Sequence, residues 1–316
     1  MVQKVSTKQI RGSFPALTAS GLIAACDGRG TSAVKNQLQV FQGANAGYFS
    51  GYQPASNYTS RFPFAVDEDA SSHGKLAEAQ NGTLTKSSGA SSATHGYAAG
   101  CGKWGKYPFA VAETSSSSGG LAISPGTCWG SGQSSINQGY GYHSGGGSGT
   151  VGVCTTAIQK WPFAADTSAT CVGDLNCNCR FEAGYSSITD GFTISARTVQ
   201  KFPFASDGNS TEIGTLSPAT YANAGTGVSS LENGYSWRST IIQFSFASAA
   251  TSTCVGASSQ PGVGSSGLSG ATHGYFDRCR NPAFYKFPYT SGSGATVVGN
   301  LTFCKGPNNY SAGSQC

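Results

Sequence analysis

The chain repeats a short segment in which a proline lies between two aromatic residues. Lys201-Phe202-Pro203-Phe204-Ala205 shows this segment in full. The other copies, some of them degenerate, have their leading aromatic at Phe14, Phe62, Tyr107, Trp161, Phe244 and Phe287. The steps between successive leading aromatics are 48, 45, 54, 41, 42 and 43 residues. Near-regular spacing of this kind indicates a repeat protein with one supersecondary unit in each period.

Two further motifs occur in phase with the first. One ends in Gly-Tyr and is clearest in Thr94-His95-Gly96-Tyr97 and Thr272-His273-Gly274-Tyr275. Variants of it end at Tyr48, Tyr140, Phe192 and Tyr235. The other, Val-Gly-x-Leu, is found in only some repeats and begins at Val172, Ile213 and Val298. Motifs in a fixed order over the whole chain favour one continuous repeat domain.

The period and the composition together predict strands. Periods in the forties are typical of propellers and of some helical arrays. The 45 glycines, interleaved with Ser, Thr and aromatic residues, leave no 15-residue window that supports a helix. Four strands of about 5–6 residues with short connections fill about 45 residues. The repeat is therefore expected to be a four-stranded β-sheet.

We predict an all-β fold, a seven-bladed β-propeller of four-stranded blades that forms a single domain over residues 1–316. Only 13 residues precede Phe14 and 29 follow Phe287, and joined end to end they make one more period. The N-terminal segment is thus expected to complete the last blade, with Val2–Ile10 in the same sheet as Val297–Cys304. Closing the ring leaves no apolar blade face exposed.

The motifs also predict positions within a blade. Alternation puts Phe202 and Phe204 on one face of their strand, where they would fill the space between neighbouring blades. Because proline removes a ladder donor, this strand is expected at the outer edge of the blade. The small residues of the Gly-Tyr strand suit the crowded region near the axis.

Composition limits the partners. Only 10% of residues are charged, against about 25% typically, and the net charge of +5 comes without a cluster of Lys or Arg. Nucleic-acid binding is therefore not expected. No apolar stretch of 18 residues occurs, so no membrane insertion is expected. The weakly apolar run from Ala16 to Cys26 coincides with the first repeat, and we expect no cleaved signal peptide.

Eleven cysteines are many for a chain of this length. Cys101 and Cys279 each lie four residues after a Gly-Tyr tyrosine, and Cys171 and Cys254 each precede Val-Gly. This placement predicts disulfides within or between adjacent blades, while buried free thiols are the alternative. The candidate disulfide cysteines are Cys26, Cys101, Cys128, Cys154, Cys171, Cys177, Cys179, Cys254, Cys279, Cys304 and Cys316. The odd number leaves at least one of them unpaired or bonded to a partner chain.

The chain shows no catalytic set, and we expect no enzyme, no metal site and no cofactor. His95 and His273 share one repeat position, which favours a structural role in a turn. Asp67-Glu68-Asp69 is expected to be a solvated turn because adjacent carboxylates rarely all face one ion, with calcium binding as the alternative. Cys177-Asn178-Cys179 is too tight for half of a zinc site. The glycine-rich link from Tyr140 to Trp161 is a flexible surface insertion or a ligand loop, and no ligand-binding residue is assigned.

Two resemblances follow from these motifs. The Gly-Tyr strand, the turn and the aromatic edge strand resemble kelch-type repeats. The sequence of residues 201–216, followed by Ser-Ser-x-x-x-Gly-Tyr at 229–235, is similar to that of repeat proteins of tailed bacteriophages, especially cyanophages. The resemblance implies a virion structural protein of the tail or baseplate, outside the cell, that docks other virion proteins as a rigid disc. The alternative is a module that binds a host surface glycan. Exposed Trp104, Trp129 and Trp237 would favour that alternative.

Overall fold

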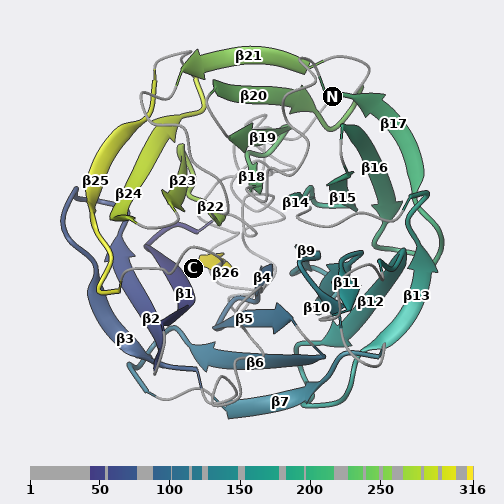
Figure 1. Ribbon diagram of the computed structural model, residues 1–316, viewed down its shortest axis with the longest axis horizontal. Helices are drawn as coiled ribbons and strands as arrows, with labels where there is room; N and C mark the ends of the chain where they lie inside the picture. The colour runs from purple at the N-terminus through teal and green to yellow at the C-terminus, as the bar shows by residue number, and fades with distance from the viewer. Residues whose placement is uncertain are drawn as a thin grey trace, which may run out of the picture. The chain divides into compact units, whose positions relative to one another are not determined.

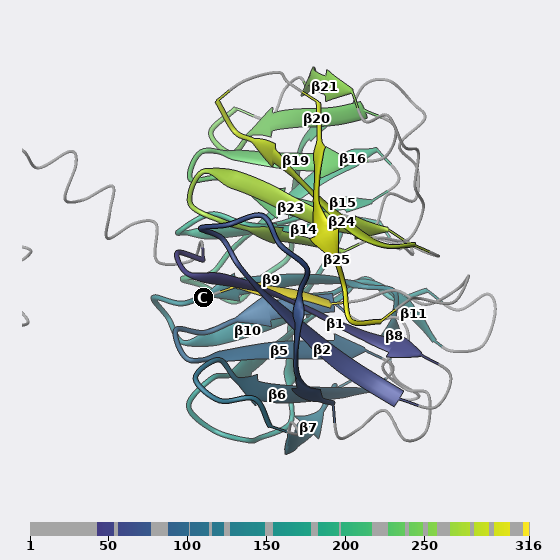
Figure 2. The same ribbon diagram turned by 90° about the vertical axis from the view of Figure 1, so that its left-hand side faces the viewer.

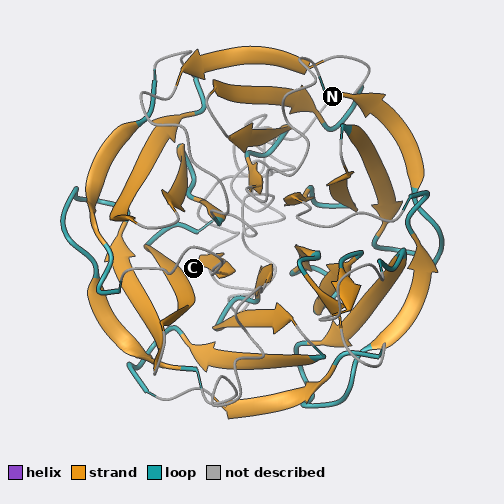
Figure 3. Ribbon diagram, viewed as in Figure 1, coloured by secondary structure: helices purple, strands orange, loops and turns teal. Residues whose placement is uncertain are grey.

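The computed structural model shows a protein built from strands. It describes residues 43–53, 56–76, 88–100, 102–113, 116–122, 127–148, 154–177, 183–195, 197–216, 227–237, 240–248, 252–257, 266–278, 281–290, 294–303 and 312–315. The chain divides into two units, and all of these residues belong to the second, Phe41–Cys316. Within the described residues every regular element is a β-strand (Figure 3). The all-β prediction is confirmed.

Six four-stranded antiparallel sheets, the blades, surround a central axis (Figure 1). From the axis outward, blade 1 contains β26 (Ala312–Gln315), β1 (Ala46–Gln53), β2 (Ser56–Pro63) and β3 (Ser71–Lys75), and blade 2 contains β4 (Ser88–Ser91), β5 (His95–Gly100), β6 (Lys103–Pro108) and β7 (Ser116–Gly120). Blade 3 contains β9 (Ser131–Ser135), β10 (Tyr140–Ser144), β12 (Ala157–Pro162) and β13 (Thr170–Asp174), and blade 4 contains β14 (Ala183–Ser186), β15 (Asp190–Ser195), β16 (Thr198–Pro203) and β17 (Thr211–Thr215). Blade 5 contains β18 (Gly227–Ser229), β19 (Asn233–Trp237), β20 (Thr240–Ser245) and β21 (Ser252–Ala257), and blade 6 contains β22 (Gly267–Ser269), β23 (His273–Arg278), β24 (Asn281–Pro288) and β25 (Thr296–Asn300). A separate two-stranded sheet joins β8 (Thr127–Cys128) to β11 (Gly147–Ser148).

The prediction of seven blades is wrong, and so is the predicted closure. The propeller has six blades, and the strand from the other end of the chain is β26, which completes the first blade by pairing with β1. The last blade is complete within 267–300 and takes no strand from the N-terminal segment. Figure 2 shows blades 1 and 6 side by side where the ring closes. The predicted first repeat at Phe14 and the segment Val2–Ile10 lie outside the described residues.

Within each blade, the leading aromatic lies across a glycine of the neighbouring strand. Gly191 pairs directly with Phe202, and a Cβ on this glycine would come closer than 3.0 Å to the phenylalanine ring. The same pairing joins Gly47 to Phe62, Gly96 to Tyr107, Gly141 to Trp161, Gly234 to Phe244 and Gly274 to Phe287. The Gly-Tyr motif of blade 3 is therefore Gly141-Tyr142, two residues after the predicted one. Glycine is needed here because the ring fills the space of its side chain.

Between blades, the second aromatic stacks on the Gly-Tyr aromatic of the preceding blade. Ring centroids lie 4.5–5.1 Å apart, with interplanar angles of 22–32°. The pairs are Phe109 on Tyr48, Phe163 on Tyr97, Phe204 on Tyr142, Phe246 on Phe192, Tyr289 on Tyr235 and Phe64 on Tyr275. Such pairs contribute about 0.5–1.5 kcal/mol each beyond the area that they bury. The last pair joins blade 1 to blade 6, so the stacks run around the whole ring.

The prediction that the motif aromatics fill the space between blades is confirmed, but their strand is not the outer edge. Phe202 and Phe204 belong to one buried cluster with Tyr142. Their strand, β16, is the third of its blade, and β17 lies outside it. Pro203 is the last residue of β16, where the ladder ends and a missing N–H costs no hydrogen bond.

The outer strands carry a bulge in every blade. The register between third and outer strands shifts at one position in all six sheets. The residue that is skipped precedes Gly74, Gly119, Gly173, Gly214, Gly256 or Gly299. The Val-Gly-x-Leu motif marks this bulge, which the sequence showed in only three repeats because the skipped residue varies, as in His73 and Ser118. A bulge increases the local twist and helps each edge to avoid pairing with another chain.

Ion pairs cross between blades on the side where the aromatic motifs end. Lys106 lies 2.6 Å from Asp166 of the next blade, and Lys286 lies 2.6 Å from Asp67 across the closure. Lys160 pairs with Asp207 in the same way. The aspartates are about half exposed, so each pair contributes at most about 1 kcal/mol. In the described part of the chain, no helix is long and apolar enough to span a membrane.

The glycine–aromatic pairing predicts a specific sensitivity to one methyl group. We expect Gly191→Ala to lower the free energy of unfolding by about 1–3 kcal/mol, because the Phe202 ring must move out of a packed core. Gly208→Ala is the matched control, since nothing lies within 4 Å of a Cβ there. Urea denaturation measures both. Equal stabilities of the two variants would contradict this account of the motif.

Candidate functional site

Six glycines, one from each inner strand, surround the axis. A Cβ on any of them would come closer than 3.0 Å to the carbonyl oxygen of the glycine in an adjacent blade. The contacts form a closed cycle through Gly89, Gly132, Gly184, Gly227, Gly267 and Gly313. Backbone contacts this close, with Cα–H groups facing carbonyl oxygens, allow only glycine at these positions. They fix the distance between neighbouring blades at the axis.

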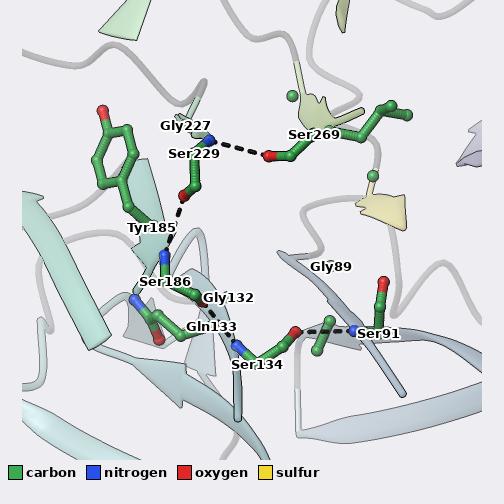
Figure 4. Close-up of a pocket in the computed structure, with 15 residues that line it drawn as sticks. Gly89, Ser91, Gly132, Gln133, Ser134, Tyr185, Ser186, Gly227, Ser229 and Ser269 are labelled. Atoms are coloured by element: carbon green, nitrogen blue, oxygen red, sulfur yellow. Dashed lines mark hydrogen bonds between the residues drawn. The ribbon is translucent and has the colours of Figure 1, made fainter. Parts of the chain in front are cut away.

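Serine hydroxyls follow the glycines and form a directional relay (Figure 4). In blades 2 to 6 a serine lies two residues after the axial glycine. In blades 2 to 5 the backbone N–H of this serine donates to the Oγ of the equivalent serine in the next blade. The bonds run from Ser91 to Ser134, Ser134 to Ser186, Ser186 to Ser229 and Ser229 to Ser269, at 2.8–3.1 Å. The sixth position is Gln315, in β26. The described bonds of the relay therefore join blades 2 to 6 in order, and the inner strand of blade 1 has glutamine in place of serine.

These residues line an axial hollow with an empty volume of about 420 Å³, open ends included. Its lining contains glycine backbone, serine hydroxyls and a few larger side chains such as Gln133 and Leu268. Among the described residues, no Asp, Glu, Lys, Arg or His lines it. This described lining can exchange hydrogen bonds with a small neutral molecule or with water, and none of its residues is a general acid, a general base or a charged metal ligand.

A buried polar cluster lies beside the hollow, between blades 3 and 4. The side-chain amide nitrogen of Gln133 lies 2.8–3.1 Å from the hydroxyls of Ser131, Ser144 and Thr193 and from the carbonyl oxygen of Phe192, and its two N–H groups are shared among these four acceptors. All four of these polar side chains are at most 2% exposed. The hydroxyls also bond to one another, at 2.8–2.9 Å. Saturated buried networks of this kind fix a unique packing and leave no group to bind a ligand.

His143 is a buried residue whose place the sequence did not reveal. Its Nδ1 lies 2.8 Å from Ser88 Oγ of blade 2, and its exposed fraction is 0%. Its Nε2 has no hydrogen-bond partner among the described residues and faces the backbone at Gly130. Burial lowers the pKa of His143 to about 4. The imidazole is therefore neutral at physiological pH and ties blade 3 to blade 2.

The repeat histidines His95 and His273 are the first residues of β5 and β23, and their backbone carbonyls accept the N–H groups of Ser92 and Gly270 across the preceding bend. Nδ1 of His95 and of His273 lies 2.8–2.9 Å from the hydroxyl of the preceding threonine. Burial lowers the pKa of both residues, and a nearby lysine of the same blade, Lys106 or Lys286, lowers it further. Both sites lack further ligands, since no cluster of His, Cys, Asp or Glu in the described residues has the geometry to hold a metal ion.

The acidic triplet is more than a solvated turn, although its side chains are exposed. Asp67 pairs with Lys286, and a carboxylate oxygen of Asp69 accepts the backbone N–H of Asn300 at 2.8 Å. Both partners belong to blade 6, so the triplet joins blade 1 to its neighbour at the closure. In blade 4, Asn209 bonds in the same way to the backbone N–H of Asp174 in blade 3.

The predicted disulfides are not found. Within the described residues no disulfide is present, and Cys171, Cys177 and Cys254 are free thiols, while Cys154 is half-buried. Cys171 and Cys254 share one repeat position but belong to blades 3 and 5, which are not neighbours, so their equivalence reflects the repeat and not a bond. The side chains of the other seven candidates, Cys26, Cys101, Cys128, Cys179, Cys279, Cys304 and Cys316, lie outside those that the structure describes.

The tryptophans do not form an exposed platform. Trp104 is 0% exposed and stacks on Trp161, and Trp237 is 2% exposed and stacks on Phe276. Trp129 is half-buried and has a positive φ of 61°, which is unusual for a bulky residue. It lies directly after β8. In the glycine-rich link, Gly145 and Gly146 also have positive φ, and residues 145–147 are buried, so this part of the link is packed.

Comparison with known proteins adds no family. No protein-family model matches the chain, and no curated protein matches it. What is established is the architecture, a β-propeller of repeated blades with a neutral, hydroxyl-lined axis.

The buried imidazole predicts a pH-dependent stability. The pKa of His143 is lower in the folded protein, about 4, than its ordinary value of 6.5, so protons bind more tightly to the unfolded chain. Stability is full above pH 6.5 and falls as the pH decreases towards 4, by up to about 3 kcal/mol from this residue. His143→Gln keeps a polar group of similar size that does not titrate. The difference in unfolding free energy between wild type and variant should change over this range, and a constant difference would contradict the buried, neutral state.

The reactivity of the exposed thiol of Cys171 should depend on the charge of Asp174. Burial, and then the charge of Asp174, raises the pKa of Cys171. A raised pKa reduces the thiolate fraction, which is the reactive form. We therefore expect Asp174→Asn to increase the rate at which iodoacetamide alkylates Cys171 at pH 7.5, as measured by peptide mass spectrometry without reduction, while the rate at the exposed Cys254 serves as the internal reference. A thiol blocked before alkylation at either position would show a disulfide where the structure has none.

Proposed function

We propose that this propeller is a rigid, non-enzymatic docking module that binds other proteins in a virus particle, at the tail or baseplate of a tailed phage. The kelch-like Gly-Tyr strands and the similarity of the repeat sequence to phage repeat proteins support the placement in a virus particle. The observation that supports the docking role is that charged side chains in the ring hold neighbouring blades together and do not gather in the axial hollow. Lys106, Lys160 and Lys286 each pair with an aspartate of the next blade, and none of the described residues that line the axial hollow is ionisable at neutral pH.

Rigidity is what such a module would contribute. Every interface carries an aromatic stack and a close glycine contact at the axis, so neighbouring blades are held at both their inner and their middle strands. A surface that is already rigid loses little conformational entropy when a partner binds. The module needs no cofactor, no nucleic acid and no membrane for this role.

Two exposed valines mark the surface that we assign to docking. Val66 and Val111 follow the second aromatic by two residues in the adjacent blades 1 and 2, and are 51% and 52% exposed. The same position in blades 3, 4 and 5 holds Ala165, Ser206 and Ser248, which are also exposed. The repeat therefore favours small residues there, and the two larger apolar side chains depart from it on one side of the ring. Exposed apolar side chains on a rigid frame are suited to anchor a protein partner.

The proposal predicts that these valines are needed for incorporation into particles. We expect the double variant Val66→Asp and Val111→Asp to be depleted at least tenfold from purified particles, as measured by immunoblotting with an antibody to the propeller. The matched control, Ala165→Asp and Ser206→Asp, places the same charges in the same loops of blades 3 and 4. Both variants must keep the wild-type melting temperature. Absence of the wild-type protein from particles would refute the proposal, and equal incorporation of both variants would remove the valines from it.

A carbohydrate-binding role is the second candidate. The neutral, hydroxyl-rich lining of the hollow favours it, whereas burial of Trp104 and Trp237 removes two of the aromatic side chains that could have stacked on sugars. A glycan array with the purified protein distinguishes the two roles. Binding that is lost with Ser186→Val, in the serine relay, would favour the glycan role.

A further inference from the structure

Blade 1 takes its inner strand from a distant part of the chain, unlike the other five blades. In blades 2 to 6 the inner strand directly precedes the second strand, as β4 precedes β5. In blade 1 the strands β1 to β3 lie between Ala46 and Lys75, but the inner strand begins at Ala312. The inner edge of β1 is therefore an open strand edge whenever β26 is absent, and open edges bind extended segments.

The contacts that the structure describes for β26 are those of its backbone. It pairs with β1 over four positions, from Ala312 opposite Ser50 to Gln315 opposite Gly47. After the axial glycine, the other inner strands carry Ala90, Gln133, Tyr185, Val228 and Leu268, all at most 3% exposed. In β26 this residue is Ser314, and serine has little apolar area to bury. A strand held in this way can be replaced by another strand of the same kind.

The place of β26 selects its occupant by size. A Cβ at Gly313 would overlap the carbonyl oxygen of Gly267 in blade 6. On the other side, the carbonyl oxygen of Gly313 occupies the position that a Cβ on Gly89 would need. An occupant must therefore be an extended segment with glycine at the axial position and small residues around it. A second copy of β26, Ala-Gly-Ser-Gln, has glycine at the axial position with the small residues alanine and serine on either side of it.

We propose that the inner edge of β1 at Gly47–Ser50, with the axial backbone of Gly89 and Gly267, is a strand-acceptor site that can take β26 from a second copy of this chain. The chain's own β26 occupies the site in the isolated protein, because its tether gives it a high effective concentration. When many copies are held close together, β26 of one copy closes the ring of another and links the two. This inference does not depend on the function proposed above.

A truncated ring tests the acceptor site directly. The chain ending at Phe303 lacks β26, and a fluorescent peptide of residues 309–315 replaces it. We expect saturable binding by fluorescence anisotropy and a rise in the melting temperature of the truncated ring. The matched peptide with Gly313→Val should bind at least tenfold more weakly, because its side chain meets the Gly267 carbonyl. A folded truncated ring that binds neither peptide, or both equally, would overturn the proposal.

A second experiment applies if the truncated ring does not fold. Two full-length copies with different affinity tags are unfolded, mixed at high concentration and refolded together. We expect the tags to purify together through strand exchange, and a fivefold or greater loss of this association when both copies carry Gly313→Val. Refolded wild-type copies that remain separate at all concentrations would refute exchange between chains.

Discussion

The stack of one aromatic ring on another across each blade interface is the contact on which the rest of the structure depends. Phe204 of blade 4 lies on Tyr142 of blade 3, while Phe202, two residues earlier, covers Gly191 of its own blade. One short motif thus sets the packing inside a blade and the packing between blades. Because the two rings are only two residues apart, at the end of β16 and just after it, neither contact can shift without the other.

At the axis a second set of contacts, between glycine backbones, also fixes the distance between neighbouring blades. There the blades are too close for any side chain, and glycine backbone meets glycine backbone. Polar groups fill the space between the two sets: the Gln133 cluster, the bond from His143 to Ser88, and the serine relay. Most of the chemistry of these groups is used for holding blades together.

The departures from the repeat are concentrated in blades 1 and 3. Blade 1 takes its inner strand from the C-terminal part of the chain, and it has Gln315 at the position where the other inner strands have serine. Blade 3 carries the additional sheet of β8 and β11, and Trp129 with its positive φ. Residues that recur in every blade hold the fold together. Residues found in one blade alone are therefore the candidates for contact with a partner or ligand.

The sequence by itself determined the class of fold, the four-stranded blade and the place of the motif aromatics between blades, since these follow from the repeat period and from alternation within one short segment. The number of blades and the closing strand were decided only by the tertiary structure. Phe14-Pro15-Ala16 has a leading aromatic but no second one to stack on a neighbour, and counting it gave seven blades instead of six. Closure depends on which strand fits beside β1 at the axis. Because β26 contains no aromatic motif, the repeat pattern could not identify it as the closing strand. The burial of His143 was equally hidden, because it arises where two blades meet and not within either of them.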